Sequence, residues 1–466
     1  MTLKSFGFIG RSSNTMKALL IKPKFENVFT RLSLITTEPL ELEYMVSICD
    51  RNNVESEICD MTLKKHSVAR SVKRFKPDIV GITANFIHID TVKKYVKQIK
   101  KINPNIKVIL GGSHAEVKPE DFFFDGIDIV TYSGGFKAFE NIIKYENIDL
   151  KDIKGIYYLK NSEWVQNERE AFDISDLPFP NRNHFYKNIK KYKYVNLKPC
   201  AIVKASYSCP QNCNYCFSTL LNNGKYICRE PKNVVEEIKN INCENIWIVD
   251  DTFYVDKNKL KVFIDLIKKE NIQKNYSLYY RVDFIANNPE IMQELAGIGV
   301  KMCAVGLEVI DDEVLKNYNK GTNVTLILKA LEVLKKCNIT CIGLLMIDID
   351  AEKDYFEKLY KFIEKHELYL STVSVLTPMP GTEQYEKYKD RFITSDYKKW
   401  DFVHLVISPR KMSNFTFYKE FYKLYFKLGK LILKAKVLSP VYLKSAMIAT
   451  ANFWFEAIKS LGGKKQ

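Results

Sequence analysis

The chain has 466 residues, of which 71 are Lys or Arg and 55 are Asp or Glu, so its formal net charge is +16, and 46% of its residues are hydrophobic. This length leaves room for two or three domains, while the composition excludes a disordered chain and a membrane-spanning protein. Eleven cysteines, an odd number in a long chain, argue for reduced thiols and against a disulfide framework. Because the start lacks a secretory signal, we expect a cytoplasmic protein.

Lysine dominates the positive charge, in short pieces such as residues 187–198. Such pieces are typical of a solvated surface, and an anionic partner is the alternative. No arginine-rich recognition helix or aromatic-interleaved strand pair stands out, so we expect no specific nucleic-acid partner.

Residues 16–148 alternate short apolar runs with amphipathic stretches, after an expected loose extension over residues 1–15. Strand then helix, repeated, predicts a doubly wound parallel sheet with helices on both faces. The expected strands cover 18–23, 55–61, 78–85 and 107–111, and the expected helices cover 41–52, 66–75 and 91–102. Ligands of such sheets bind at the carboxyl ends of the strands, here at residues 81–88 and 111–115.

Residues 149–198 are expected to form a linker with a hairpin that turns at Asn161 and Ser162. Alternation resumes over 199–385, where six strands separated by helices predict a partial parallel (β/α)6 barrel. The expected strands cover 201–208, 246–251, 276–283, 301–309, 340–348 and 370–376. The expected helices cover 231–241, 257–270, 289–297, 324–336 and 352–366. Residues 386–466 are expected to form a helical C-terminal region.

Three cysteines follow the first barrel strand in the stretch "CPQNCNYC", at Cys209, Cys213 and Cys216. Thiolates spaced by three residues and then two can reach separate irons of one cluster from a short loop. Three ligands would leave one iron of a [4Fe-4S] cluster open to bind something else. A structural zinc site, the alternative, requires four closing ligands, and Cys228 and Cys243 do not form the second pair that such sites use.

The spacing, with Tyr215 before the last cysteine, resembles the signature of the radical S-adenosylmethionine (SAM) superfamily. The segments 176–185, 248–257, 305–308, 320–321 and 376–385 are similar to the branch of that superfamily with a cobalamin-binding domain. The resemblance covers roughly residues 17–420. It implies an oxygen-sensitive enzyme in which the open iron binds SAM and one electron cleaves it to a 5'-deoxyadenosyl radical.

The resemblance also implies where the cofactors bind. The candidate SAM contacts are Tyr215, Asp250, Asp251, Arg281, Gly306 and Glu308. A carboxylate suits ribose hydroxyls and a guanidinium suits a carboxylate, although rim salt bridges are the alternative for Arg281 and Asp250. The candidate cobalamin contacts are Thr83, Asn85, Gly111, Gly112, Ser113 and Gly134.

The sequence departs from the branch in two places. The turn at residues 133–135 reads Ser-Gly-Gly, without the acidic residue that the branch usually carries there. No Asp-x-His-x-x-Gly stretch supplies a lower axial ligand for cobalt, so His88 and His114 are interpreted as polar loop residues.

The C-terminal region contains aromatic and aliphatic residues at helical spacing between lysines. The candidates for a buried stripe that closes the barrel mouth are Tyr418, Phe421, Tyr422, Tyr425, Phe426, Leu428, Leu431 and Leu433. The alternative is an amphipathic surface that contacts a membrane peripherally and suits a lipid-like substrate. His404, in a segment that faces substrate in the family, is a candidate general base, or else a hydrogen-bonded core residue.

The resemblance therefore implies a cobalamin-dependent radical SAM C-methyltransferase that acts on an unactivated carbon of a small-molecule or lipid-like substrate. A radical SAM enzyme that cyclises or rearranges its substrate without methyl transfer is the alternative. A non-enzymatic iron-sulfur protein with an anionic partner is the third. An electron donor such as flavodoxin or ferredoxin is implied as a partner.

Overall fold

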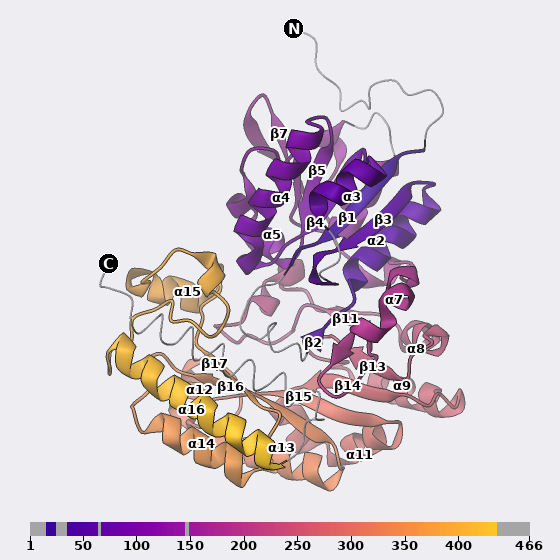
Figure 1. Ribbon diagram of the computed structural model, residues 1–466. Helices are drawn as coiled ribbons and strands as arrows, with labels where there is room; N and C mark the ends of the chain where they lie inside the picture. Colours follow the sequence, from indigo (N-terminus) through magenta and orange to yellow (C-terminus); the bar gives the residue numbers. More distant parts are fainter. Residues whose placement is uncertain (1–14, 25–34, 64–66, 145–148, 436–466) are drawn as a thin grey trace.

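The computed structural model describes residues 15–24, 35–63, 67–144 and 149–435. The described residues form two large sheets with their helices, and one sheet lies near each end of an elongated molecule (Figure 1). The expected extension at residues 1–15 lies almost entirely outside the described residues, as does the last part of the expected C-terminal region.

The N-terminal sheet has seven strands in the order β3-β1-β4-β5-β6-β7-β8. Its strands are β1 (Lys17–Lys22), β3 (Glu55–Asp60), β4 (Ile79–Thr83), β5 (Lys107–Gly111), β6 (Ile129–Thr131), β7 (Ile156–Lys160) and β8 (Glu163–Gln166). Its helices are α2 (Leu40–Arg51), α3 (Val68–Phe75), α4 (Ile89–Ile102), α5 (Ser113–Val117) and α6 (Gly135–Lys144). Two separate apolar cores, one with α3 and α4 and one with α2 and α6, confirm that helices cover both faces.

The hairpin turns where the sequence predicts, with Asn161 and Ser162 both at positive φ, but its place in the fold differs. β7 pairs antiparallel with β6, so β7 and β8 extend the N-terminal sheet and make it mixed. The apolar face of β7, which includes Ile156 and Tyr158, is buried in the same core as α6. The assignment of this hairpin to the linker was therefore wrong, because short antiparallel pairing across 25 residues leaves no local signal.

The second sheet has six parallel strands in the order β10-β13-β14-β15-β16-β17, which confirms the partial barrel. These strands are β10 (Ala201–Val203), β13 (Asn245–Ile248), β14 (Asn275–Tyr280), β15 (Val300–Glu308), β16 (Thr340–Ile347) and β17 (Thr372–Val375). The helices between them are α8 (Pro231–Asn240), α9 (Lys257–Lys269), α10 (Val282–Asn287), α11 (Pro289–Gly297), α12 (Asp312–Asn317), α13 (Val324–Lys336) and α14 (Tyr355–Lys365). Two small ribbons, β2 (Ile35–Thr36) with β9 (Lys193–Tyr194) and β11 (Ser206–Tyr207) with β12 (Ile227–Cys228), accompany the barrel.

A buried ion cluster joins the two sheets near α7 (Asn183–Asn188). Arg182 donates to Glu38 at 2.8 Å and to Glu237 of α8 at 2.6 Å, and Arg229 donates to Glu237 at 2.5 Å. All four side chains are at most 5% exposed. Because a buried charge without a partner is strongly destabilising, this cluster ties the N-terminal sheet, the linker and the barrel together.

After α15 (Glu383–Tyr388), the helix α16 (Asn414–Ala435) runs across α14 on the outside of the barrel (Figure 1). Phe421, Tyr422, Leu428 and Leu431 are buried as predicted, whereas Phe426 and Leu433 are 41% and 42% exposed and were wrongly placed in the buried stripe. Tyr425 donates to the carbonyl of Val373, so α16 covers the β17 edge and not the mouth. No helix among the described residues is long and apolar enough to cross a membrane.

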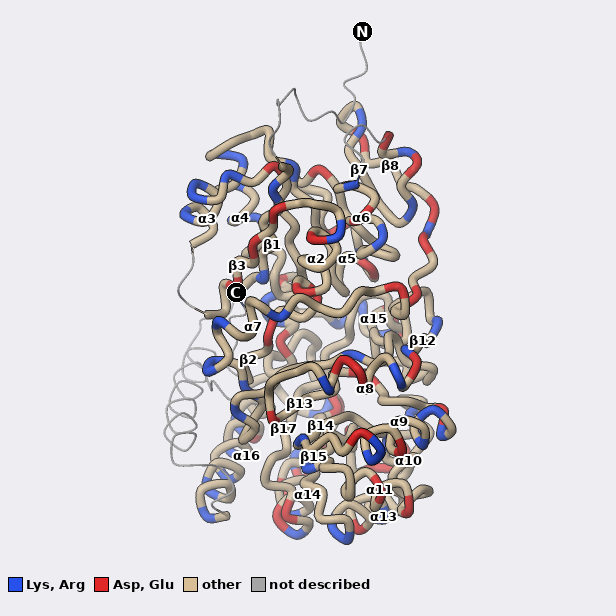
Figure 2. Tube along the Cα trace, turned by 90° about the vertical axis from the view of Figure 1, so that its right-hand side faces the viewer, with Lys and Arg blue, Asp and Glu red and all other residues tan. Residues whose placement is uncertain are grey.

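Lysine and arginine positions alternate with aspartate and glutamate positions along most of the chain trace, and basic positions are densest on α3 and α4 (Figure 2). Many of these lysines are paired with a neighbouring carboxylate, as Lys239 is with Glu270 and Lys335 with Glu367. The distribution favours the interpretation of the positive charge as a solvated surface.

Candidate active site between two sheets

The three cysteines lie on the loop between β11 and the 3-10 turn η7 (Phe217–Thr219), at the carboxyl end of the first barrel strand. The loop is closed by side chains on both sides: the hydroxyl of Ser208 donates to the carbonyl of Ser218, and the hydroxyl of Ser218 donates to Asp251. The backbone of Cys216 donates to the carbonyl of Cys213 at 3.2 Å, which turns the loop tightly between these two cysteines. The loop therefore holds the three thiols near one another at the barrel mouth.

These thiols suit a cluster better than a single metal ion. Structural zinc is closed by four ligands, whereas this loop supplies three thiols. Cluster ligands bind separate irons at the corners of a cube and do not have to converge. Burial raises the pKa of Cys216 to about 11. This thiol is therefore protonated at neutral pH without metal, and binding to iron would release its proton. The donor set thus fits a [4Fe-4S] cluster.

A cation and a carboxylate form a buried pair beside the cysteine loop. The Nζ of Lys320 donates to Glu308 at 2.6 Å and to the hydroxyl of Tyr215 at 3.2 Å. Burial is the largest single effect and lowers the pKa of Lys320, but the charge and hydrogen bond of Glu308 together with the nearby Cys213 raise the pKa overall. Glu308 follows an irregularity in the β15 ladder and has φ of 58°. Strained backbone of this kind is typical of functional sites.

Arg281 connects this pair to the cysteine loop. Its Nη2 donates to the carbonyl of Lys320 at 2.6 Å, its Nη1 lies 3.8 Å from the sulfur of Cys213, and its Nε donates to Asp283 at 2.9 Å. Gly306 leaves the space that the pair occupies, because a Cβ there would lie 2.4 Å from the Oε1 of Glu308 and 2.8 Å from the Nζ of Lys320. The structure thus brings Tyr215, Arg281, Gly306 and Glu308 together, and it adds Lys320.

The two aspartates after β13 occupy different environments. Asp250 is 1% exposed and accepts a hydrogen bond from the backbone of Ala205 at 2.8 Å, and burial raises its pKa to about 6. Asp251 is exposed and accepts from Ser218 at 2.7 Å. Asp250 therefore holds the backbone just after β10 by a buried hydrogen bond. Asp251 is exposed, so a ligand can reach its carboxylate.

The candidate cobalamin contacts lie at the carboxyl ends of β4 and β5. The hydroxyl of Ser113 donates to the side chain of Asn85 at 2.9 Å, which links the two loops. A Cβ at Gly112, whose φ is 111°, would lie 2.5 Å from the carbonyl of Ala84, and one at Gly111 would lie 2.6 Å from the hydroxyl of Thr131. Close packing within the domain therefore accounts for both glycines. Thr83 ends β4 beside Gly112.

The Ser-Gly-Gly turn after β6 is covered by a segment of the linker. Gly134 has φ of 57°, and a Cβ there would lie 2.7 Å from the side chain of Glu170. The hydroxyl of Ser133 donates to the carbonyl of Glu170 at 2.7 Å. Gly134 consequently packs against Glu170 of the linker, whereas the loop after β4 contacts Phe217 beside the cysteine loop.

The loops after β4 and β5 face the cysteine loop directly. Phe86 packs edge-on against Phe217, with ring centroids 5.8 Å apart, and Phe217 follows Cys216 in the chain. The ring of His114 stacks on Phe86 at 4.1 Å and its Nε2 pairs with Asp121 at 2.8 Å. Two candidate cofactor regions from different sheets thus share one interface. Held in this way by Asp121 and Phe86, His114 is a buried structural residue.

His404 lies in the segment that follows the last barrel strand. Its Nδ1 is 2.9 Å from the Oδ1 of Asp401, and Asp401 also accepts from the backbone of Val403 and His404. The backbone of Val375 donates to the carbonyl of Phe402, so this segment sits at the carboxyl end of β17, on the mouth side of the barrel. Asp401 and Lys320 are not predicted from the sequence, although Asp401 lies 3 residues from His404 and Lys320 lies 12 residues from Glu308.

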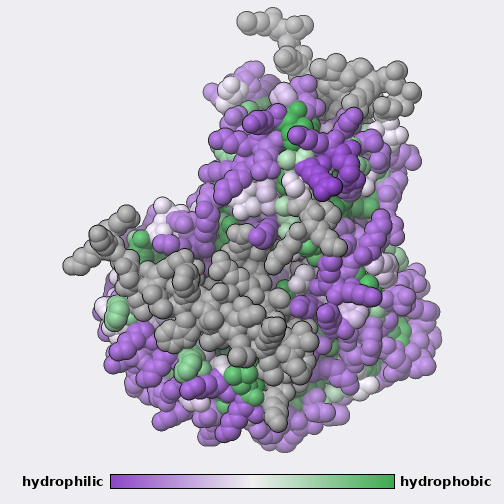
Figure 3. All heavy atoms as spheres, viewed as in Figure 1, coloured by the Kyte–Doolittle hydropathy of each residue, from purple (hydrophilic) through white to green (hydrophobic). Residues whose placement is uncertain are grey.

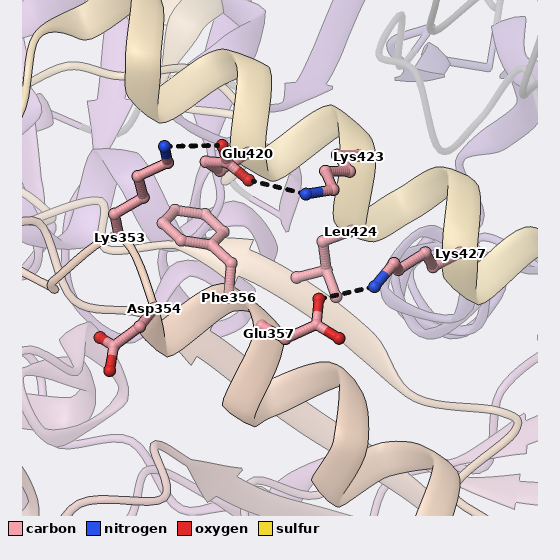
Figure 4. A pocket seen from close by; sticks show the side chains of 8 residues that line it. All are labelled: Lys353, Asp354, Phe356, Glu357, Glu420, Lys423, Leu424 and Lys427. Atoms are coloured by element: carbon pink, nitrogen blue, oxygen red, sulfur yellow. Dashed lines mark hydrogen bonds and ion pairs between the residues drawn. The ribbon is translucent and has the colours of Figure 1, made fainter.

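A shallow pocket of about 550 Å³ lies elsewhere, on the outer surface between α14 and α16 (Figure 4). Three lysines line it, and each is paired: Lys353 and Lys423 with Glu420, and Lys427 with Glu357. Because these charges satisfy one another, the pocket reflects the packing of two helices and carries no free cation for an anionic ligand.

An α/β domain that presents loops to a three-cysteine loop on a partial barrel defines a class of enzyme: radical SAM enzymes with a second cofactor domain. Comparisons with known proteins agree. Residues 33–143 match the B12 binding domain and residues 203–363 match the radical SAM superfamily. The chain belongs to the radical SAM superfamily, in the branch with a B12-binding domain, and is a cobalamin-dependent radical SAM enzyme.

Several proteins are similar over most of the chain. The hopanoid C-3 methylase of Methylococcus capsulatus is 27% identical over 88% of this chain and 79% of its own length. The anaerobic magnesium-protoporphyrin IX monomethyl ester cyclase of Cereibacter sphaeroides is 24% identical over 74% of this chain and 59% of its own length. The cobalamin-dependent SAM radical enzyme OxsB has the same fold, with a TM-score of 0.73 and 14% identity over 95% of this chain and 72% of that chain.

Proposed function

We propose that this enzyme methylates an unactivated carbon of a small-molecule or lipid-like substrate. The observation that supports this most is the contact between Phe86, on the loop after β4, and Phe217, directly after the cysteine loop. Methylation by this class requires a radical source and a methyl donor within reach of one substrate, and the two candidate cofactor regions meet there. The domain limits at residues 198 and 385 are part of this proposal, and the first limit moves from residue 148 to the end of β8 at Gln166, because the hairpin belongs to the N-terminal sheet.

The residues of the barrel take defined roles in this proposal. Cys209, Cys213 and Cys216 hold three irons of the cluster, Lys320 and Arg281 offer positive charge to the carboxylate of SAM, and Glu308 accepts from its ribose. When bound, the cluster with SAM supplies a 5'-deoxyadenosyl radical, and cobalamin supplies the methyl group. The chain itself binds and orients these groups and excludes water.

We infer that the first loops of the N-terminal sheet contact cobalamin through Thr83, Asn85 and Ser113. Their side chains lie at the edge that faces the barrel, and they offer hydroxyl and amide groups to the polar rim of a large ring. Gly111 and Gly112 are proposed to contact cobalamin through their backbone, in addition to packing against Thr131 and Ala84 within the domain. Gly134 is the weakest of the candidates, since Glu170 packs on it.

The substrate contacts proposed here centre on His404. Because Asp401 holds its Nδ1, the Nε2 of the imidazole is left as the polar atom that can meet a substrate at the barrel mouth, either as a base or as a hydrogen-bonding partner. A lipid-like substrate is favoured by the similarity to a hopanoid methylase. Cyclisation without methyl transfer is the second candidate, favoured by the similarity to a protoporphyrin ester cyclase.

Two partners complete the proposal. A reduced flavodoxin or ferredoxin supplies the electron, and the net charge of +16 favours the approach of an acidic donor. The protein acts in the cytoplasm, where its eleven free cysteines stay reduced.

We propose that α16 docks on an anionic membrane surface, where the enzyme meets a lipid-like substrate. Phe415, Phe426 and Leu433 are exposed at intervals of 11 and 7 residues, which place them on one side of α16. Lys430 lies over the ring of Phe426 at 4.3 Å. Elsewhere on the face in Figure 3, apolar side chains stand singly among hydrophilic ones. Sedimentation with vesicles that contain or lack anionic lipid tests this docking.

Anaerobic reconstitution with iron, sulfide and hydroxocobalamin tests the proposed function. After desalting, an absorbance spectrum measures retained cobalamin, and a dithionite-driven assay measures 5'-deoxyadenosine. Retention of one cobalamin with 5'-deoxyadenosine formation is the expected result. Formation of 5'-deoxyadenosine without retained cobalamin would overturn methyl transfer and favour the cyclising alternative.

A further inference from the structure

One carboxylate links the N-terminal sheet to both ends of the cysteine loop. The Oε2 of Glu116, on α5, accepts a hydrogen bond from the hydroxyl of Tyr207 at 2.5 Å, and its Oε1 accepts from the backbone of Asn222 at 2.5 Å. Tyr207 precedes Cys209 by two residues, and Asn222 follows Cys216 by six. A single side chain therefore spans the loop that carries all three cluster cysteines.

Glu116 is also one helical turn from the candidate cobalamin loop. α5 begins at Ser113, directly after Gly112, and the backbone of Glu116 donates to the carbonyl of Gly112 at 3.1 Å. The hydroxyl of Ser113 in turn binds the side chain of Asn85 on the neighbouring loop. Only a few covalent and hydrogen bonds thus separate the proposed cobalamin contacts from the cysteine loop.

The surroundings of Glu116 are closely packed. A Cβ at Gly381 would lie 2.9 Å from Val117, the next residue of α5, and 2.9 Å from Leu220 beyond the cysteine loop. Tyr207 packs edge-on against Phe172, with ring centroids 5.2 Å apart. Burial raises the pKa of Glu116 and opposes its charge, while the hydrogen bonds from Tyr207 and Asn222 favour the charged form. A polar anchor in such an apolar interface fixes geometry more sharply than apolar packing alone.

We propose that Glu116 is a positioning residue that sets the separation between cobalamin and the iron-sulfur cluster. It acts through Tyr207 and Asn222 on the cysteine loop and through α5 on the cobalamin loop. This inference rests on the proposed function, since it requires that cobalamin binds to the loops after β4 and β5. A small displacement of reacting groups is sufficient to cost about 100-fold in rate, so an anchor at this point controls productive transfer.

The test compares Glu116→Ala and Tyr207→Phe with the wild type as reconstituted holoenzymes. Electron paramagnetic resonance of cob(II)alamin, recorded with the cluster oxidised and then reduced, measures the magnetic interaction between the two centres. In both variants we expect loss of most of that interaction, while iron content, cobalamin content and 5'-deoxyadenosine formation stay at the wild-type level. Glu120→Ala is the matched control, because Glu120 is an exposed carboxylate four residues further along.

Each outcome decides a separate point. A wild-type interaction in both variants would overturn the positioning role of Glu116. If Glu116→Ala does not fold, Tyr207→Phe decides the question alone, because it keeps the ring that packs on Phe172 and removes only the hydroxyl. If the wild type itself retains no cobalamin, the proposed function fails before the variants are compared.

Discussion

The ammonium group of Lys320 lies 2.6 Å from the carboxylate of Glu308, and Gly306 provides the space for both. The two side chains are 9% and 14% exposed, so each neutralises the other in a largely dry site. Breaking such a pair from one side leaves a buried charge without a partner.

Lys320→Met is therefore expected to destabilise the protein by about 3 to 5 kcal/mol. Lys320→Met combined with Glu308→Leu is expected to recover most of that loss, because neither charge is then left alone. Both variants are expected to lose 5'-deoxyadenosine formation. Urea denaturation of the apoprotein and a reconstituted cleavage assay make the two measurements. A double variant as unstable as Lys320→Met would contradict the pairing argument.

The cysteine loop gives a prediction with an internal control. Replacing Cys209, Cys213 or Cys216 singly by alanine is expected to abolish cluster absorbance and SAM cleavage, since each thiolate binds its own iron. Cys228→Ala is expected to retain both. Cys228 lies on β12 opposite Ser206, and its sulfur is 3.6 Å from the Nζ of Lys259. Iron and sulfide analysis checks the result, and loss of iron from Cys228→Ala would mean that the ligand set is misassigned.

Arg182 is the centre of the ion cluster between the sheets. Arg182→Met is expected to cost about 3 to 5 kcal/mol, because Glu38 and Glu237 would remain buried without their shared cation. The matched control, Lys239→Met, breaks the exposed pair with Glu270 and is expected to leave the denaturation midpoint almost unchanged, because solvent screens that pair. Denaturation midpoints of the apoproteins provide the comparison. Equal effects of the two substitutions would show that burial does not govern this cluster.

The sequence predicts most elements of both sheets because apolar periodicity and turn residues are local signals. α13 spans Val324–Lys336, as the pattern predicts, and Asn323 caps it through the backbone of Leu326. The β7–β8 hairpin was misplaced because its pairing with β6 depends on contacts distant in sequence. The exposure of Phe426 and Leu433 was not predicted. The side of α16 that is buried depends on its packing against α14 and β17, which are distant in sequence.

The residues of the candidate site also differ in whether a local sequence signal identifies them. The three cysteines and Tyr215 form one contiguous motif, so spacing alone singles them out. Lys320, Asp401 and Glu116 gain their importance only from partners that the fold brings near. For Glu116, those partners are 91 and 106 residues away. The presence of a lysine with a glycine at residues 320–321, in a segment similar to the family, was the signal that could have identified Lys320.

His404 and Asp401 give a prediction about protonation geometry. With Asp401 accepting from Nδ1, the proton of the neutral imidazole is expected on that atom and the Nε2 is expected to be an acceptor. Asp401→Asn is expected to change the distribution of tautomers. Nitrogen NMR of histidine-labelled apoprotein measures it, with His404→Gln used to assign the signal. An unchanged signal in Asp401→Asn would show that Asp401 does not orient the ring.

Glu43 gives a prediction about pH dependence. Burial and the nearby charge of Glu38 raise the pKa of Glu43 well above its usual range, although Arg182 lowers it in part. The native state therefore keeps this proton above about pH 4.3, the pKa expected for the same carboxyl in the unfolded chain. Because the unfolded state then binds fewer protons than the native state, stability from this group falls as the pH rises.

Glu43→Gln removes the titration and keeps an acceptor for the backbone of Phe185, which donates to Glu43 at 3.0 Å. Relative to the wild type, the variant is expected to gain stability between pH 5 and pH 8, by at most about 1.4 kcal/mol for each pH unit. Glu236→Gln, an exposed change on α8, is the control and is expected to show no such trend. Urea denaturation at several pH values measures the difference. A variant that loses stability against the wild type as the pH rises would mean that Glu43 is ionised in the native state and is held by Arg182.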